Sequence, residues 1–273
     1  MSFGPNPWHQ SSWDARAAGN FMAGGAGSGL IVAAALGGGP AWLFLAGAAI
    51  VGIGLLCVWA EISRPWRALN VFFHPRTSWM TREAIVAPAL MLLALAAALS
   101  AGAAAWGAAL VALAFVYCQG RILRAARGIP AWREPTIVPL IVATGLAEGL
   151  GLWLLLAGRA APLATWAALA VALLARQWLW GRWRARIQAA PRALAAIDAA
   201  GRGVQAGTLL ALALAFAAML APLPPAAIWV LQAVAGLAAL AAGLWFKFTL
   251  VTRAAFNQGF ALPHLPVRGV RRS

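Results

Sequence analysis

"PAWLFLAGAAIVGIGLLCVWAEI", residues 40 to 62, is an apolar run interrupted by one carboxylate near its end, Glu61. A helix that crosses a bilayer needs about 20 consecutive apolar residues, and this run has that length. Polarity then changes abruptly. The segment "RPWRALNVFFHPRTSWMTREA", residues 64 to 84, holds four arginines and a glutamate before the next apolar run begins. The two stretches predict a membrane-spanning helix followed by a polar loop at the membrane surface.

The composition of the whole chain agrees with this prediction. Of its 273 residues 63% are hydrophobic and only 10% are charged, and the mean hydropathy is +0.81. A soluble domain cannot bury that fraction of apolar residues, because its surface leaves too many side chains in water. A net charge of +15 would indicate nucleic-acid binding in a soluble protein. Here the arginines flank apolar runs, so we expect contact with membrane lipid and none with nucleic acid.

Apolar runs of about this length recur along the chain, without the alternation of a membrane β-strand. They predict an all-α polytopic membrane protein in which eight transmembrane helices form one bundle. Residues 1–273 are expected to make a single integral membrane domain. The predicted spans are about 17–36, 40–62, 84–101, 103–120, 136–157, 162–183, 203–221 and 226–250.

The positive charges are distributed unevenly between the two sides of this arrangement. On one side Arg159 stands alone, whereas eighteen arginines fall on the side of both termini. Such a bias predicts that the arginine-bearing side is cytoplasmic, so that both termini are cytoplasmic. We expect the membrane to be a bacterial inner membrane. The eighteen are Arg16, Arg64, Arg67, Arg76, Arg82, Arg121, Arg124, Arg127, Arg133, Arg182, Arg184, Arg186, Arg192, Arg202, Arg253, Arg268, Arg271 and Arg272.

Two GxxxG motifs lie inside predicted spans, Gly25 with Gly29 and Gly145 with Gly149. This spacing favours close approach of two helix backbones. Glu148 follows Gly145 by three positions and shares its helix face, so we expect it to face protein rather than lipid. An ionisable group at membrane depth is a functional candidate. Glu148 is expected to be either a proton relay or a protonated packing residue.

The residue types that hold metals and haem are poorly placed for that role. A transmembrane haem takes axial histidines from within spans, and the three histidines, His9, His74 and His264, all lie outside the apolar runs. The two cysteines, Cys57 and Cys118, lie in separate runs without CxxC spacing. We therefore expect no haem and no metal bound by this chain.

Polar and aromatic residues gather around the loop at 64–84. An aromatic and basic belt occurs at headgroup depth in many membrane proteins. Such a belt requires neither carboxylates at both ends of one loop nor an asparagine just inside a span, so the pattern favours a functional site at the membrane edge. The residues of this predicted site are Arg16, Asn20, Glu61, Arg64, Arg67, Asn70, His74, Trp79 and Glu83.

The same loop resembles a family signature. "RPWRALN…SWMTREA" is similar to the sequence of membrane-anchor subunits of dimethyl-sulfoxide-reductase-type complexes, and "RGIPAW" after the fourth run is similar to a connection in that family. The glycine-rich first span resembles the related polysulfide-reductase and nitrite-reductase anchors. The ends, "FGPNPWHQSSWDARAAGNF" and "FNQGFALPHLPVRG", look most like anchors of complexes that oxidise sulfite or phenylacetyl-CoA.

This resemblance implies partners and a cofactor. The partners would be a ferredoxin-like subunit with several [4Fe–4S] clusters and a molybdenum or tungsten bis-pterin catalytic subunit, both on the cytoplasmic face. The anchor would bind a quinone, menaquinone or ubiquinone, that takes electrons from the nearest cluster. By the same resemblance Glu83 occupies the position linked to quinone handling. Glu61 stands where the dimethyl sulfoxide reductase anchor has a histidine.

Two alternatives belong to other functional classes. A transporter of small solutes or ions would use Glu148 and Arg176 as a midplane site, although the broken helices and internal repeats common in transporters are not evident. Arg176 and Lys247 are instead interpreted as side chains that reach along their helices to the membrane surface. The second alternative is a purely structural anchor without a quinone site.

Overall fold

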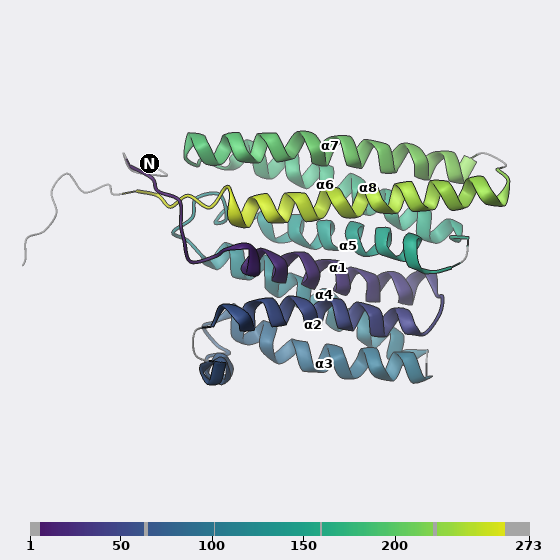
Figure 1. Cartoon of the computed structure of the whole chain (residues 1–273), viewed down its shortest axis with the longest axis horizontal. Coiled ribbons are helices and arrows are strands. Elements are labelled where there is room, and N and C mark those ends of the chain that lie inside the picture. Colours follow the sequence, from purple (N-terminus) through teal and green to yellow (C-terminus); the bar gives the residue numbers. More distant parts are fainter. Residues whose placement is uncertain (1–5, 63–64, 101, 159, 221–222, 260–273) are drawn as a thin grey trace, which may run out of the picture.

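The computed structural model describes residues 6–62, 65–100, 102–158, 160–220 and 223–259, and eight long helices dominate this part of the chain (Figure 1). Each is long and apolar enough to cross a membrane, which confirms the predicted all-α bundle and makes the chain a multi-pass membrane protein. The helices are α1 (Ala15–Gly37), α2 (Trp42–Glu61), α3 (Trp79–Ser100), α4 (Ala103–Ala125), α5 (Ile137–Leu156), α6 (Leu163–Arg186), α7 (Pro191–Leu220) and α8 (Pro225–Thr252).

Helices α1 and α5 form the centre of the bundle. In their most apolar stretches 72% and 78% of the residues are buried, compared with 28% in α3 and in α7. Helix α1 contacts α2, α4, α5 and α8, and α5 contacts α4, α6 and α8 as well. The outer helices expose large apolar residues such as Leu92 on α3 and Leu209 on α7, as expected for surfaces that face lipid.

The two GxxxG motifs explain why α1 and α5 are central. Gly145 and Gly149 lie against Gly25 and Gly29, backbone to backbone. A methyl group on Gly149 would overlap the backbone of Gly29, and one on Gly29 would overlap the carbonyl of Gly145. Only glycine permits this separation, because any Cβ would hold the helices apart. The predicted packing role of both motifs is confirmed.

Two helices begin earlier than their predicted spans. Helix α7 starts at Pro191 rather than near residue 203, and α3 starts at Trp79 rather than near residue 84. Polar residues in these first turns, including Asp198 and Arg82, interrupt the apolar run but not the helix. Proline is favoured at a first helical position because its fixed φ suits the helix and its missing N–H has no partner there. Glu83 therefore lies inside α3, not in the loop before it.

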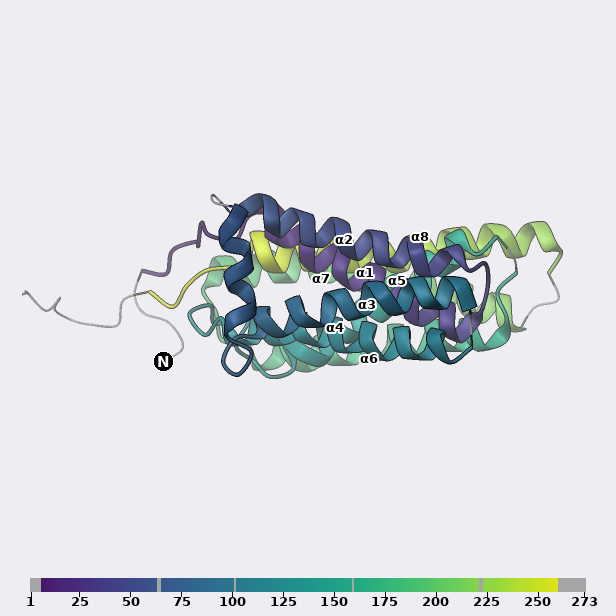
Figure 2. The same cartoon turned by 90° about the horizontal axis from the view of Figure 1, so that it is seen from below.

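The loop between α2 and α3 contains a 3-10 helix, η1 (Pro65–Phe73). Figure 2 shows η1 crossing one end of the bundle, roughly perpendicular to the long helices. Trp66 is 87% exposed and Phe73 is 71% exposed. A short helix with exposed aromatic residues at the end of a membrane bundle suits the lipid–water interface.

Both described termini reach the same end of the bundle as η1 (Figure 1). There the N-terminal and C-terminal segments pair antiparallel at His9 and Phe256. The amide of Gln10 donates to the carbonyl of Ala255 at 3.0 Å, and Gln258 donates to the carbonyl of Gly128 at 3.2 Å. We call this end, with η1, the loops after α4 and α6, and both terminal segments, the arginine-rich end.

Candidate functional site

An apolar cavity of about 560 Å³ lies under η1, beside α2 and α3, with α1 at its inner wall. Its lining is almost entirely hydrophobic. Apart from the indole N–H of Trp59, the side chains of the lining that can form hydrogen bonds are Asn20, Arg67 and Glu83. We call it the η1 cavity. Its lining residues are Asn20, Leu55, Val58, Trp59, Ile62, Arg67, Ala68, Leu69, Val71, Phe72, Met80, Glu83, Ala84, Ala87, Pro88 and Met91.

The polar wall of this cavity is the pair Asn20 and Glu83. Nδ2 of Asn20 donates a long hydrogen bond to Oε1 of Glu83, with 3.5 Å between the two atoms. Asn20 is 4% exposed and Glu83 is 6% exposed. The two residues are 63 positions apart, and the contact between α1 and α3 exists only because the helices fold together. It places an acid and an amide side by side within apolar surroundings.

Gln119 on α4 supports this pair from behind. Its Nε2 donates to the backbone carbonyl of Asn20 at 2.9 Å. The space for the amide comes from Gly24, where a methyl group would overlap Gln119. Oδ1 of Asn20 and Oε1 of Gln119 are buried and have no hydrogen-bond partner within the described chain. Buried acceptors of this kind are costly unless they have a donor. Asn20 lines both cavities, so its Oδ1 is the acceptor that a ligand there would meet.

A second, smaller cavity of about 50 Å³ adjoins the Asn20–Glu83 pair. It shares both of these residues with the η1 cavity and also includes Glu61 and Trp13. Glu61 is half-buried at the end of α2, near the surface. The two cavities therefore place one carboxylate at the membrane edge and a second carboxylate further inside, with a small void between them.

Arg16 ties α1 to the end of α2 and does not line either cavity. Its guanidinium lies 2.8 Å from Oδ2 of Asp14 and donates to the carbonyl of Ala60 at 2.9 Å. The hydrogen bond from Arg16 holds the pKa of the Asp14 carboxyl below its usual value. Because its charge is shared with Asp14, Arg16 is better suited to positioning Glu61, its electrostatic neighbour, than to contacting a ligand.

The remaining predicted loop residues are spread over different places. Asn70 and His74 are exposed and line neither of the two cavities. Trp79 lines a different pocket, described below. Arg64 falls outside the described residues. Of the nine residues predicted for this site, four lie in the walls of the two adjoining cavities: Asn20, Glu61, Arg67 and Glu83.

Glu148 lies in a separate polar cluster on the other side of α1. Its Oε2 accepts a hydrogen bond from Nζ of Lys247 at 2.6 Å. Arg176 donates to the carbonyl of Ala239 at 3.1 Å and to the hydroxyl of Thr208 at 2.7 Å. None of the hydrogen bonds of the described residues joins this cluster to Asn20 or Glu83. The position of Glu148 toward protein is confirmed.

The interpretation that Lys247 and Arg176 reach the membrane surface is wrong. Both are fully buried, at 0% exposure. Each finds a partner at its own depth, Glu148 for Lys247 and polar groups of α7 and α8 for Arg176. A long cationic side chain extends to water only when the protein offers no closer partner.

The sequence analysis missed one residue, Gln119, and one interaction, the pairing of Lys247 with Glu148. Gln119 is an amide in the otherwise apolar stretch "AFVYCQG", and that isolation was the available signal. The pairing of Lys247 with Glu148 had no such signal. The two residues are 99 positions apart, and only the packing of α5 against α8 brings them together.

No protein-family model matches this chain, and no curated protein matches its sequence. The relationship to quinone-reactive anchors therefore stays a prediction. Within the described residues, no group of three or more His, Cys, Asp or Glu side chains is placed to hold a metal ion.

The residues of the η1 cavity fit a quinone. Its apolar walls would suit the ring and the isoprenoid tail, and the exposed residues Trp59, Leu69 and Phe72 at the rim would face the lipid from which a quinone would enter. Asn20 and Arg67 offer N–H donors for a carbonyl oxygen, and the partnerless Oδ1 of Asn20 offers an acceptor for a hydroxyl.

Proposed function

We propose that this chain is the membrane anchor and quinone-binding subunit of a molybdopterin oxidoreductase complex. In this role it passes electrons from a [4Fe–4S] subunit to membrane quinone. The observation that carries the proposal is the buried Asn20–Glu83 pair on the wall of an otherwise apolar cavity of about 560 Å³. A binding site that combines apolar walls with a few convergent polar groups is typical of a cofactor pocket.

The two carboxylates suit the delivery of protons. Reduction of a quinone consumes two protons for every two electrons. Glu61 lies half-buried near the surface, where it exchanges protons with water, and Glu83 lies buried beside the cavity. Nδ2 of Asn20 donates to Oε1 of Glu83, so Oε2 is the carboxyl oxygen without a bond to Asn20. A carboxyl group within hydrogen-bond reach of the reacting oxygen acts as the proton donor.

The arginine-rich end suits the docking of the partner subunits. It carries η1, the terminal segments and the arginines that flank the helices, and the positive charge favours an acidic partner surface. By the charge bias of the sequence this end faces the cytoplasm. The proposed complex would lie in a bacterial inner membrane. The η1 cavity opens at this end, so a quinone bound there lies close to a docked cluster subunit.

The buried ion pair speaks against the transporter alternative. That alternative requires Glu148 and Arg176 as a midplane binding site. In the structure Glu148 is paired with Lys247, and Arg176 donates to Ala239 and Thr208. A solute that used both charges as its binding site would have to break these contacts first.

The test is turnover of the complex with quinone after Glu83→Gln or Glu61→Gln. Glutamine keeps the size of the side chain but cannot release a proton, so quinone-linked turnover should fall by about 10²-fold or more for Glu83→Gln. Electron delivery from the clusters to a soluble dye should be unchanged. Glu134→Gln is the matched control, because Glu134 lies at the same end but lines neither cavity. Wild-type quinone turnover in both site variants would refute the proposal.

A further inference from the structure

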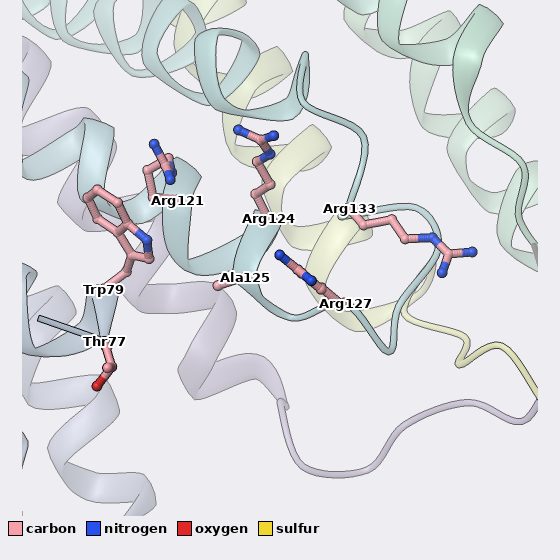
Figure 3. Close-up of a pocket in the computed structure, with 7 residues that line it drawn as sticks. All are labelled: Thr77, Trp79, Arg121, Arg124, Ala125, Arg127 and Arg133. Carbon is pink, nitrogen blue, oxygen red and sulfur yellow. The ribbon is translucent and has the colours of Figure 1, made fainter. Parts of the chain in front are cut away.

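A third cavity, a pocket of about 640 Å³, opens at the arginine-rich end (Figure 3). It lies between the start of α3, the end of α4 and the loop after α4. Arg121 and Arg124 come from α4, and Arg127 and Arg133 come from the loop. Trp79, at the start of α3, lies beside Arg121. We call it the arginine pocket. It shares no lining residue with the η1 cavity.

The side chains that line this pocket in the described part of the chain include four arginines and no acidic residue. The chain has six acidic residues, and none of them lines the pocket. Arg121 donates to the hydroxyl of Tyr117 at 2.7 Å, and this partner is neutral. Arg133 donates to Oε1 of Gln258 at 3.3 Å. The guanidinium groups of Arg124 and Arg127 form no hydrogen bond and no ion pair with the described residues. The pocket therefore suits a ligand with at least one negative charge.

Aromatic residues fix the depth of the pocket in the membrane. Trp79 and Tyr117 meet edge to face, with their ring centroids 5.8 Å apart, and the guanidinium of Arg121 lies 4.1 Å from the ring centroid of Trp79. Tryptophan and tyrosine are enriched at the level of the lipid headgroups. Arg121 and Arg124 follow Tyr117 along α4 toward the end of the helix, so they lie at the depth of the phosphates.

The outer face of α4 continues from the pocket into the membrane. At 100° per residue, Trp106, Leu110, Tyr117, Arg121 and Arg124 fall within a stripe about 60° wide on one helix face. Trp106 is 54% exposed and Leu110 is 68% exposed. Along this stripe the surface changes from apolar to aromatic to cationic. A phospholipid lying along α4 has the same order, from acyl chain to glycerol to phosphate.

We propose that the arginine pocket binds the headgroup phosphate of an anionic phospholipid whose acyl chain lies along the exposed face of α4. Arginine forks match phosphate oxygens with paired hydrogen bonds, and basic pockets between transmembrane helices are suited to anionic headgroups. A soluble acidic partner would match the arginines but would leave the apolar part of the stripe without a role. This site does not depend on the quinone function of the η1 cavity.

The experiment titrates the purified full chain, in a zwitterionic detergent, with dioleoyl phosphatidylglycerol and separately with dioleoyl phosphatidylcholine. Bound lipid is counted by native mass spectrometry. Phosphatidylglycerol should bind more tightly than phosphatidylcholine. The double variant Arg124→Gln/Arg127→Gln should weaken phosphatidylglycerol binding by roughly 30-fold, since each arginine near the surface contributes about 1 kcal/mol. The variant Arg182→Gln/Arg192→Gln removes the same charge outside the pocket and should bind like the wild type.

Three results would overturn the proposal: equal affinity for the two lipids, an unchanged affinity of the pocket variant, or the same loss in the control variant. Competition with inorganic phosphate distinguishes a lipid site from a site for free phosphate. Displacement of phosphatidylglycerol by a modest excess of inorganic phosphate would show a site for free phosphate instead of lipid. If the glutamine variant is not monodisperse, Arg124→Lys/Arg127→Lys replaces it. Lysine keeps the charge but loses the paired hydrogen bonds, so an intermediate loss is expected.

Discussion

Nζ of Lys247 donates to Oε2 of Glu148 at 2.6 Å, and neither side chain exposes any surface. The pair lies beside the glycine contact of α1 with α5, where a methyl group on Gly25 would overlap Nζ of Lys247. On the far side, a methyl group on Gly243 would collide with the Glu148 carboxylate. Glycines on two helices thus make the room that a buried ion pair needs, and the pair joins α5 to α8 at the centre of the bundle.

Substituting either residue of this pair alone should destabilise the fold, and substituting both together should restore most of the stability. Lys247→Met leaves the Glu148 carboxylate without its partner, and Glu148→Gln leaves Lys247 beside Arg176 with no carboxylate. Each single change should destabilise the fold by about 3 kcal/mol, because one buried charge loses its compensation. The double variant Glu148→Gln/Lys247→Met should recover most of that loss. Unfolding in sodium dodecyl sulfate, followed by circular dichroism, measures all three. Additive losses in the double variant would show that the pair does not act as a unit.

The glycine crossing of α1 and α5 should tolerate no side chain. Gly149→Ala introduces a methyl group where the backbone of Gly29 lies, so the two helices must move apart. The expected loss is about 3 kcal/mol, at the upper end for overpacking of a core. Gly52→Ala is the matched control, since a Cβ at Gly52 meets no atom within 4 Å. Thermal unfolding of the two variants in the same detergent makes the comparison. Equal melting temperatures would contradict the close helix contact.

Asn20 should contribute to quinone affinity, whereas Asn70 should not. Asn20 lies buried in the wall of the η1 cavity, and Asn70 lies exposed on η1. Asn20→Leu removes one donor and should weaken binding of a short-chain quinone roughly tenfold, the equivalent of one hydrogen bond. Asn70→Leu, the same chemical change, should have no effect. Quenching of tryptophan fluorescence reports binding because Trp59 lines the cavity. Similar losses in both variants would place the quinone elsewhere.

The orientation of the bundle is open to a direct test. A fluorescent protein fused after Ser273 should be bright, because the arginine bias predicts a cytoplasmic C-terminus. Alkaline phosphatase fused at the same position should be inactive. A fusion within the short connection between α5 and α6 should give the opposite pair of results. An active phosphatase at the C-terminus would reverse the orientation and remove the cytoplasmic docking of the partner subunits.

The sequence alone determined the architecture of this protein. Eight apolar runs of the length of a bilayer predict eight helices, because backbone groups in lipid must bond within their own segment. The helix-packing role of four glycines was predicted in the same way, because their spacing places each pair on one helix face. They are Gly25, Gly29, Gly145 and Gly149. Glu148 was predicted to face protein on the same basis. These predictions succeed because each depends on periodicity and composition within one segment.

The sequence determined less about the candidate site. Asn20, Glu61, Arg67 and Glu83 stood out as polar residues next to apolar runs, and the structure brings them to two adjoining cavities. Asn70, His74 and Trp79 stood out for the same reason but lie elsewhere. Sequence position shows that a residue is near the membrane edge. It does not show toward which neighbour the side chain points, since η1 turns across the bundle and α3 begins one turn earlier than its hydropathy indicates.

Only the tertiary structure decided which polar groups meet. Lys247 and Arg176 each have the length to reach water, and their sequence surroundings favoured that interpretation. They remain buried because α8 brings Lys247 to Glu148 and because α7 and α8 bring Thr208 and Ala239 to Arg176. A buried charge takes the arrangement of lowest free energy, and that depends on partners from distant parts of the chain. Helix formation thus depends on the local sequence. The pairing of Glu83 with Asn20 and of Glu148 with Lys247 depends on how the helices pack.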